Sequence, residues 1–505
     1  MKIRKNICVI IISLFAALCV SACDGTMLDI TREALLNFKP CAGIAQWARS
    51  VTAGPDSSNF NSVTVGPDGS VYAAGYINLT GEYDFGNEVT AAGKASKNIL
   101  LVKYRSDGTA LWANSVTAGD NFSEFISVTV GPDGSVYAAG YIYGTGSFDF
   151  GNSVSVAGKC TTRNVVLVKY NIDGLAQWAK SVTAGTNSSQ FYSVAVGSDG
   201  SVYAAGYIYL NIEYDFGDDL FHAYVTGNNA SGSNIVLVKY NSDGTALWAR
   251  SAITGPSESL FNSVTVDPEG SVYAAGKILG SDEYGFGNEI TVNGGFEFDN
   301  SVLVKYDSDG TALWAKSVTT GPAASWFNSV TVDKDGYVYA AGDISGTDPF
   351  NFGNLVTAKG DSSSQNIVIV KYNSDGLAQW AKSATTGPAE SLFNSVTVGI
   401  DGCVYAAGYI SGTDQFDLGN LVTVNGSHSG QNIVVVKYNN DGLAQWARSV
   451  TSGTNNSFSK SVAGHSDGSV YTAGTIYGTT EYDFGSAVTV SGGDTNQNVV
   501  LVKYK

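Results

Sequence analysis

Histidine is scarce in this chain of 505 residues, which has only His222, His428 and His465, and no two of them share a short motif. Neither a GxSxG nor an HExxH segment occurs, so the usual signs of a serine hydrolase or a zinc protease are missing. The sequence therefore predicts a protein that is not an enzyme, with no catalytic residue, no metal ligand and no cofactor to assign.

Positive charge is also in short supply. The chain has 28 Lys and Arg against 45 Asp and Glu, a formal net charge of -17. Nucleic acids bind basic surfaces, so we expect no nucleic-acid partner. An acidic surface resists self-association, and we expect a monomer.

Cysteine is too sparse for a disulfide framework. Two of the six cysteines lie in the N-terminal leader, and Cys41, Cys160 and Cys403 are scattered over distant parts of the chain. None of these three has a CxxC spacing or a nearby histidine. We therefore predict that all three are unpaired and that they hold no zinc.

The N-terminus carries an export signal. Residues 1–22 combine a basic start with an apolar run that is shorter than a membrane-spanning helix requires. The following "VSAC" resembles the lipobox of bacterial lipoproteins, which implies lipidation at Cys23 and a tether over residues 23–42. The expected location is the bacterial cell envelope, at the outer membrane, the cell surface or the periplasmic side. The alternative is an ordinary secretory signal with an incidental cysteine.

Long-range repetition dominates the rest of the chain. One tryptophan recurs about every 66 residues, and a "VKY" lysine keeps the same spacing. The seven tryptophans are Trp47, Trp112, Trp178, Trp248, Trp314, Trp380 and Trp446. Such a period is typical of repeat architectures.

Each copy contains two hairpins. In the first copy, "FNSVTV" (60–65) and "SVYAAGYI" (70–77) flank a "GPDG" turn, and "NILLVKY" (98–104) and "TALWANSV" (109–116) flank "RSDG". Val, Thr, Tyr and Phe favour strands, and Asp-Gly favours tight turns. We predict an all-β fold over residues 43–505, a seven-bladed β-propeller of four-stranded antiparallel blades, named A to D from the axis outward.

The last copy ends after its "VKY", at Lys505, without a tryptophan segment of its own. We predict that "GIAQWARSV" (43–51) supplies this missing strand D. The N-terminal strand would then pair with the C-terminal blade and close the ring, which removes an open sheet edge.

The hairpin pair resembles the bacterial β-propeller repeat family labelled SBBP. The matching segments are "VTVGPDGSVYAAG" (63–75) and "NILLVKYRSDGTALW" (98–112), and they return in every copy. The resemblance implies an extracytoplasmic protein that is often lipid-anchored. The family has no single established activity, so the resemblance assigns no catalytic residue.

Three recurring motifs have competing interpretations. "DFG", as at 84–86, is predicted to start a small outer hairpin rather than to bind metal, and Gly285 and Asn351 replace its Asp in two copies. "DSDG" (307–310) and "DKDG" (333–336) lack the other ligands of a calcium loop and are predicted to be hairpin turns. The "VKY" lysines are predicted to pack rather than to form an anion-binding ring.

Antiparallel alternation predicts that the A–B and C–D turns lie on one face, and that the B–C and D–A connections lie on the other. The first set is nearly uniform, whereas the second varies most in the third to fifth copies. Loops on a rigid scaffold commonly carry binding residues. The candidate ligand-binding residues, mostly aromatics that commonly anchor interfaces, are Tyr209, Phe221, His222, Tyr224, Phe296, Phe298 and Trp326. Drift of unconstrained loops is the alternative.

The sequence favours a non-catalytic binding or scaffold protein for a protein or glycan, held at the membrane by its lipid. Two alternatives stay open: an extracytoplasmic hydrolase, lyase or quinoprotein-like enzyme, and an envelope assembly scaffold. Convergent carboxylates or histidines on one face would favour the enzyme. An aromatic patch without perturbed acids would favour binding.

Overall fold

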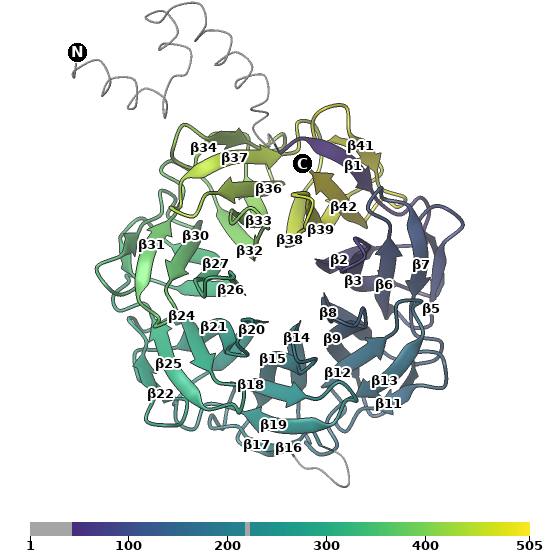
Figure 1. Ribbon diagram of the computed structural model, residues 1–505. Coiled ribbons are helices and arrows are strands. Elements are labelled where there is room, and N and C mark those ends of the chain that lie inside the picture. The colour runs from purple at the N-terminus through teal and green to yellow at the C-terminus, as the bar shows by residue number, and fades with distance from the viewer. Residues whose placement is uncertain (1–42, 218–222) are drawn as a thin grey trace, which may run out of the picture. The chain divides into compact units, whose positions relative to one another are not determined.

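The computed structural model describes residues 43–217 and 223–505. The predicted signal peptide, Cys23, the tether and Cys41 lie outside this part. Within it every regular element is a strand, and no helix is long and apolar enough to cross a membrane. Seven four-stranded antiparallel sheets stand around one axis, so the predicted seven-bladed β-propeller is confirmed (Figure 1).

The two inner strands of each blade form its first hairpin. Strand A, the innermost, is β2 (Ser58–Val65), β8 (Ser123–Val130), β14 (Ser189–Val196), β20 (Ser259–Val266), β26 (Ser325–Val332), β32 (Ser391–Val398) and β38 (Ser457–Gly464) in blades one to seven. Strand B is β3 (Val71–Asn78), β9 (Val136–Tyr143), β15 (Val202–Tyr209), β21 (Val272–Leu279), β27 (Val338–Ser345), β33 (Val404–Ser411) and β39 (Val470–Tyr477).

The two outer strands follow in the same order. Strand C is β6 (Lys97–Tyr104), β12 (Arg163–Tyr170), β18 (Ser233–Tyr240), β24 (Asp299–Tyr306), β30 (Gln365–Tyr372), β36 (Gln431–Tyr438) and β42 (Gln497–Tyr504). Strand D is β7 (Ala110–Asn114), β13 (Ala176–Lys180), β19 (Ala246–Arg250), β25 (Ala312–Ser317), β31 (Ala378–Lys382), β37 (Ala444–Ser449) and, for blade seven, β1 (Ala45–Arg49).

A small hairpin between strands B and C decorates the rim of each blade. The seven pairs are β4 (Gly81–Asp84) with β5 (Thr90–Gly93), β10 (Ser147–Asp149) with β11 (Ser155–Ala157), β16 (Glu213–Asp215) with β17 (Tyr224–Thr226), β22 (Glu283–Gly285) with β23 (Thr291–Asn293), β28 (Phe350–Asn351) with β29 (Thr357–Ala358), β34 (Gln415–Asp417) with β35 (Thr423–Asn425), and β40 (Glu481–Asp483) with β41 (Thr489–Ser491).

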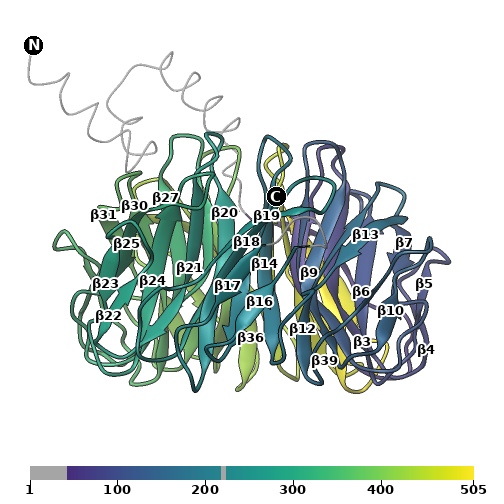
Figure 2. The same ribbon diagram turned by 90° about the horizontal axis from the view of Figure 1, so that it is seen from below.

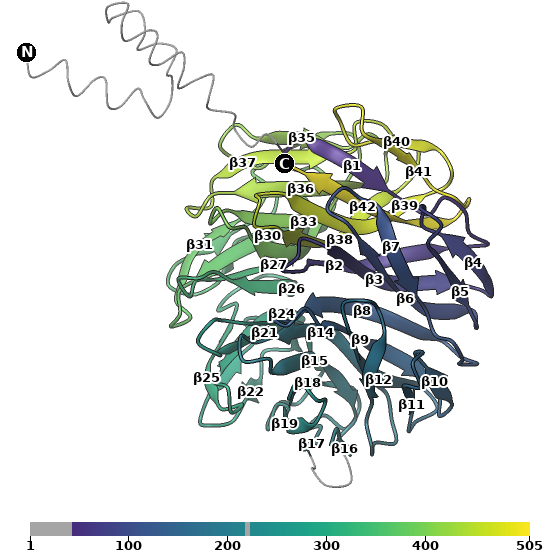
Figure 3. The same ribbon diagram turned by 45° about the vertical axis from the view of Figure 1, so that its right-hand side comes forward.

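Ring closure occurs as predicted. Strand β1 pairs antiparallel with β42, with Trp47 opposite Lys503 and Arg49 opposite Leu501 (Figure 3). The sheet order is β1-β42-β39-β38, so the two ends of the chain build one blade together. Because β42 is paired on both sides, blade seven leaves its C strand with no open edge.

The core lies between blades rather than within one. Phe60 of blade one shares a buried cluster with Tyr471 and Leu501 of blade seven, and Tyr72 on the other side of blade one shares a cluster with Phe125 of blade two. Each blade therefore buries both faces against its neighbours, and burial of these apolar faces drives the assembly of the ring.

Repeated serines connect neighbouring blades. The hydroxyl of Ser123, the first residue of β8, accepts a hydrogen bond from Ile99 N–H of blade one at 3.1 Å. Ser62 Oγ accepts another from Val128 N–H of blade two at 3.1 Å. Both bonds recur at every blade junction with similar lengths. These constant residues are explained by packing of the ring.

In six of the seven blades the repeated tryptophan and the "VKY" lysine also connect neighbouring blades, at the end of the ring that carries the A–B and C–D turns, which we call the turn face. Trp112 Nε1 and Lys103 Nζ both donate to the carbonyl of Ile172, in the C–D turn of the next blade, at 3.2 Å. The Trp112 ring also packs on Gly174 of that turn, where a Cβ would lie 3.0 Å from the indole. Six of the seven lysines therefore link blades, as the packing interpretation predicts, whereas Lys437 pairs with Asp401 of its own blade at 2.7 Å.

The recurring acidic motifs are turns. Asp84 of "DFG" caps the outer hairpin by accepting a bond from Gly86 N–H at 2.7 Å. Asp333 of "DKDG" accepts bonds from the Asp335 and Tyr337 amides at 2.9 Å, and Gly336 has φ 79°. Over residues 43–217 and 223–505, no group of three or more potential metal ligands gathers.

The two predicted faces are also present. The D–A connections and the ends of strand B lie together at the end opposite to the turn face, where the bridge between Ala53 and Asp84 joins the connection to the outer hairpin. We call this end the loop face. Figure 2 shows the ring from the side, with the blades extending between the two faces.

Candidate functional site

Two strand positions at the loop face differ from blade to blade, although their neighbours are constant. In strand A the first residue is always Ser, whereas the second residue changes. In strand B the residue after the "AAG" or "TAG" glycine changes as well. We call these fourteen positions the axial ring: Asn59, Glu124, Gln190, Leu260, Trp326, Leu392 and Phe458 on strand A, and Tyr76, Tyr141, Tyr207, Lys277, Asp343, Tyr409 and Thr475 on strand B.

The backbone brings the two positions of a blade together. In blade five Trp326 of β26 is the register partner of Asp343 of β27, and the register then shifts at a bulge between Phe327 and Ser329. A Cβ at Gly342 would lie 1.9 Å from the Trp326 carbonyl oxygen. Only glycine allows this close approach, which explains why a glycine precedes the variable strand B position in every blade.

The strand A members of the ring separate into two arcs. Blades one to three carry Asn59, Glu124 and Gln190, which form a polar arc. Blades four to seven carry Leu260, Trp326, Leu392 and Phe458, which form an apolar arc. Strands A surround the axis in Figure 1, so the two arcs lie on opposite sides of it.

Glu124 is the centre of the contacts between blades one and two. Its carboxylate pairs with Lys97 Nζ at 3.0 Å and accepts bonds from Tyr141 Oη and Asn61 Nδ2, each at 2.9 Å. Lys97 also lies over the ring of Tyr76, 3.9 Å from its centroid. Burial, with Glu124 nearby, raises the pKa of Tyr76 to about 12, so this phenol is neutral and donates hydrogen bonds.

Arg163 continues the network into blade three. It lies on the exposed first position of β12, donates to Gln190 Oε1 at 3.0 Å, and its guanidinium is 4.8 Å from the centroid of Tyr141. Tyr207, the register partner of Gln190, packs against Tyr192 with a centroid separation of 5.8 Å. This side of the ring therefore combines hydrogen-bonding groups with aromatic rings.

Lys277 occupies the strand B position of blade four. Its ammonium pairs with Asp299 at 3.0 Å and lies over the Trp326 indole, 4.6 Å from the centroid. Trp326 Nε1 is buried and has no hydrogen-bond partner among the described residues. The indole is therefore held by packing and by the cation, not by its N–H group.

Asp343 is the most buried acid of the ring, at 2% exposed. Its carboxylate accepts bonds from Gln365 Nε2 at 3.0 Å and from Asn328 Nδ2 at 3.4 Å. Burial raises the pKa of Asp343 to about 7, and the carboxylates of Glu390 and Asp299 act in the same direction. Asp343 therefore changes its charge near neutral pH.

Blade seven contributes a second lysine that lies over an aromatic ring. Lys460 lies over Phe458 at 4.9 Å from the ring centroid, and burial lowers the pKa of the Lys460 ammonium. Thr475 donates a hydrogen bond to Asn59 of blade one, and Tyr76 of that blade donates to Gln497 at 3.0 Å. The axial network therefore continues through the junction that closes the propeller.

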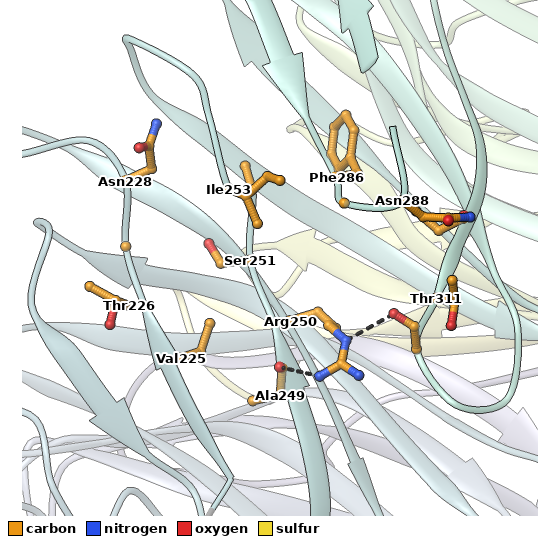
Figure 4. A pocket seen from close by; sticks show the side chains of 15 residues that line it. Val225, Thr226, Asn228, Ala249, Arg250, Ser251, Ile253, Phe286, Asn288 and Thr311 are labelled. Carbon is orange, nitrogen blue, oxygen red and sulfur yellow. Dashed lines mark hydrogen bonds between the residues drawn. The ribbon is translucent and has the colours of Figure 1, made fainter. Parts of the chain in front are cut away.

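A groove lies elsewhere, at the rim between blades three and four (Figure 4). Its volume is about 630 Å³, and Arg250 crosses it. The Arg250 guanidinium is held by backbone groups, because it donates to the carbonyls of Gly310, Ala249 and Asp309 at 2.9 to 3.0 Å. A similar groove occurs between blades four and five, so the feature belongs to the repeat and does not mark a specific site.

The predicted candidate residues are not gathered at one place. Trp326 belongs to the axial ring, whereas Tyr224 lies on the outer hairpin strand β17 and is 51% exposed. Phe296 and Phe298 contact each other, with centroids 5.4 Å apart, on the segment that enters β24. Tyr209 ends β15 and donates to the Ser231 carbonyl at 3.3 Å. Phe221 and His222 lie outside the described residues.

Two of these groups are close neighbours. Asn300 holds the segment of Phe296 and Phe298 by donating to both of their carbonyls, at 2.9 and 2.7 Å. Asp299, next to Phe298, binds the Lys277 that covers Trp326. The phenylalanine pair therefore lies on the same side of the loop face as Trp326.

Sequence reasoning missed most of the axial ring because it compared loops and not strand positions. The signal was present: after the constant Ser, the second column of strand A reads Asn, Glu, Gln, Leu, Trp, Leu, Phe. A residue that serves only packing should be the same in each copy. Variation at a structurally fixed strand position indicates a role that differs from blade to blade.

The chain is a β-propeller repeat protein. No family model matches it. An uncharacterized WD repeat-containing protein of Acanthamoeba polyphaga mimivirus is 24% identical over 355 residues, and the match covers 58% of this chain. The chain spans only 24% of the length of that relative.

Solved structures resemble the propeller weakly. Virginiamycin B lyase from Staphylococcus aureus is 9% identical with a TM-score of 0.41, over 90% of this chain and 98% of that one. A protein of unknown function from Dyadobacter fermentans is 13% identical with a TM-score of 0.40, over 91% and 99% of the two chains. A polysaccharide lyase is 11% identical with a TM-score of 0.39, over 90% of each chain. Likeness at this level bears on neither activity nor substrate.

Proposed function

We propose that this propeller is a non-catalytic binding protein whose loop face contacts the ligand. One observation carries the proposal: the side chains that distinguish one blade from another concentrate at the loop face, whereas the turn face repeats the same contacts. A binding surface for an asymmetric ligand needs different groups around the axis, and a rigid ring supplies fixed positions for them.

A capture experiment with variants of the two faces tests this proposal. The full-length chain serves as bait for glycans and for envelope proteins, beside the triple variant Phe296→Ala, Phe298→Ala and Trp326→Ala. The control is Ile400→Ala, because Ile400 is a 72% exposed apolar residue in an A–B turn of the turn face. Loss of capture in the triple variant alone is expected. Equal capture by both variants would refute the loop-face proposal.

A hydrolase or lyase is the second candidate, because the axial ring contains an acid suited to proton transfer. Asp343 has a pKa of about 7 through burial, and Glu390, which accepts a bond from Tyr409, acts on it. A catalytic acid works best with a pKa near the working pH. If the ligand found by capture is cleaved by the wild type and not by Asp343→Asn, this candidate replaces the binding protein.

The cellular location is proposed from the leader sequence. Residues 1–22 and Cys23 match a lipoprotein signal, so we propose export and a lipid anchor in the bacterial envelope. Cys23→Ser should leave unprocessed precursor and abolish labelling with a fatty-acid probe. Continued labelling of the variant would remove the anchor from the proposal.

A further inference from the structure

The axial ring differs from a packing element because its two sides differ in kind. Asn59, Glu124 and Gln190 occupy the same strand position as Leu260, Trp326, Leu392 and Phe458. The constant Ser that precedes this position makes the same inter-blade bond at all seven junctions. The backbone is therefore equivalent around the axis, and the polarity of the side chains changes by arc.

Charges at the ring are balanced locally. Lys97 pairs with Glu124, and Lys277 pairs with Asp299, each at 3.0 Å. The other charged groups of the ring and its margin are two bases, Arg163 and Lys460, and three acids, Asp343, Glu258 and Glu390, the last two at the residue before strand A. The two signs nearly cancel, so the ring has little net field with which to attract a strongly charged ligand, even though the whole chain has a net charge of -17.

The ring is also rich in groups that combine an apolar surface with a hydrogen-bonding tip. Tyr76, Tyr141, Tyr207 and Tyr409 occupy four of the seven strand B positions. Trp326 presents an indole that is half-buried at the axis. Aromatic rings of this kind supply stacking surface, and phenol, amide and carboxylate groups beside them supply directional bonds.

Resting on the proposed loop-face function, we infer that the axial ring is the ligand site and that its ligand is an uncharged oligosaccharide. A sugar ring has an apolar C–H face and a rim of hydroxyl groups. The indole of Trp326 and the leucines of the apolar arc match the face, whereas the half-buried phenol of Tyr76, across the axis, matches the hydroxyls. A protein partner fits less well, because its interface requires about 800 Å² of accessible surface on each side, and the ring residues are buried or half-buried.

The test measures binding by the purified full-length chain on an array of neutral β-glucan, mannan and galactan oligosaccharides, with polyuronate and sulfated chains beside them. The strongest hit is then titrated by calorimetry. Trp326→Ala should weaken binding by at least about tenfold, the loss expected for an aromatic anchor. Trp326→Phe keeps a stacking ring and gives up only an N–H group that has no partner, so it should bind within about threefold of the wild type.

Tyr76→Phe provides a second arm from the opposite side of the axis, and it keeps the test decisive if Trp326→Ala does not fold. Loss of a hydroxyl-binding phenol should weaken binding by about five- to tenfold. Ile400→Ala, at the turn face, is the control, and Phe298→Ala reports whether the loop outside the ring also contributes. Thermal unfolding of each variant separates lost binding from lost structure.

The outcomes divide cleanly. Binding of neutral glycans that falls in Trp326→Ala and Tyr76→Phe but not in Ile400→Ala supports the inference. Binding of charged glycans alone, or neutral binding that depends only on Phe298, overturns it. If no glycan binds but a protein is captured through loop-face residues, the inference fails and the proposed function stands. If ring and loop variants behave like the wild type toward every captured ligand, both fail.

Discussion

The two faces of the propeller use the same repeat in opposite ways. At the turn face Trp112 and Trp248 make the same bond to the next blade, each at 3.2 Å, and pack on the same glycine of the next C–D turn. At the loop face equivalent positions carry opposite charges, as Lys277 and Asp343 do in adjacent blades. Contacts that hold the ring together can be copied seven times, whereas contacts that select an asymmetric ligand cannot.

This contrast separates stability from recognition. Changes at the turn face should lower the free energy of unfolding and leave binding intact. Changes at the axial ring should alter binding or its pH dependence, and the rim of the loop face should tolerate substitution. The variants below test this division in order of the expected effect on stability.

The largest effect should follow deletion of β1, residues 45–49. Strand β1 supplies the D strand of blade seven and pairs with β42 at four register positions. Its removal exposes the β42 edge and loses the Trp47 contacts, so the loss in the free energy of unfolding should exceed the roughly 3 kcal/mol expected for truncating the half-buried Trp47. Urea unfolding measures it, and amide exchange of Gln497–Tyr504 should become much faster.

Trp47→Ala is the comparison for the deletion, because it keeps the strand and removes the side chain. It should cost on the order of 3 kcal/mol, as should Trp248→Ala in a covalently continuous blade. A deletion that costs no more than Trp47→Ala would show that the strand pairing contributes little to closure.

Asp343→Asn should produce an effect of a size comparable to that of Trp47→Ala, and it depends on pH. The pKa of Asp343 is about 7 in the folded protein, against its ordinary value of 3.8 in an unfolded chain. Between pH 4 and 7 the folded state keeps a proton that the unfolded state releases, so wild-type stability should fall as pH rises across this window, by up to about 4 kcal/mol. Above pH 7 both states are ionised and the difference is constant.

The variant removes this dependence. Asn at position 343 still accepts from Gln365 and cannot ionise, so the variant should be more stable than the wild type at pH 8 and should lack the decline. Asp335→Asn, in an A–B turn of the turn face, serves as the control. A wild-type stability that rises between pH 4 and 7 relative to Asp343→Asn would contradict the assignment.

The architecture was predictable because it repeats. The Trp and "VKY" spacing gave the number of blades, and Asp-Gly turns such as Asp107-Gly108 gave the hairpins, which the structure places within two residues of the predicted bounds. Closure followed from one unpaired segment at 43–51. Local turn chemistry and strand propensity agree with the global fold in every copy, and such agreement makes sequence reasoning dependable.

The candidate site was less predictable, since it is formed by single residues from seven distant segments. Trp326 was found because it breaks the tryptophan pattern, but Glu124, Lys277 and Asp343 were not found. Their proximity depends on strand register and on the bulge that Gly342 allows. The raised pKa of Asp343 arises from burial, which no local sequence pattern encodes.

Two tryptophans at equivalent positions test whether the repeated indole hydrogen bond at the turn face stabilises the ring. Trp248 Nε1 donates to the Ser308 carbonyl at 3.2 Å, whereas Trp446 Nε1 is buried with no partner among the described residues. Blade seven has no C–D turn to offer a carbonyl, because its C and D strands come from opposite ends of the described chain. Trp248→Phe should cost about 1 kcal/mol more than Trp446→Phe, the net value of one hydrogen bond. Equal costs in chemical denaturation would mean that the repeated indole bond does not stabilise the ring.

The smallest effect should come from Phe298→Ala, which tests how far the functional part of the loop face extends from the axis. Phe298 is 58% exposed, and its ring contacts that of Phe296. An exposed side chain contributes little to folding, so the variant should lie within about 0.5 kcal/mol of the wild type in unfolding experiments. The Phe298 carbonyl, which accepts a hydrogen bond from Asn300, belongs to the backbone, so this bond survives the substitution.

If the axial ring alone recognises the ligand, the affinity of Phe298→Ala is also unchanged. Trp326→Ala in the same titration shows how much affinity is lost when an anchoring side chain is removed. A loss of affinity in Phe298→Ala as large as that in Trp326→Ala would extend the recognition surface from the axis to the B–C segment of blade four.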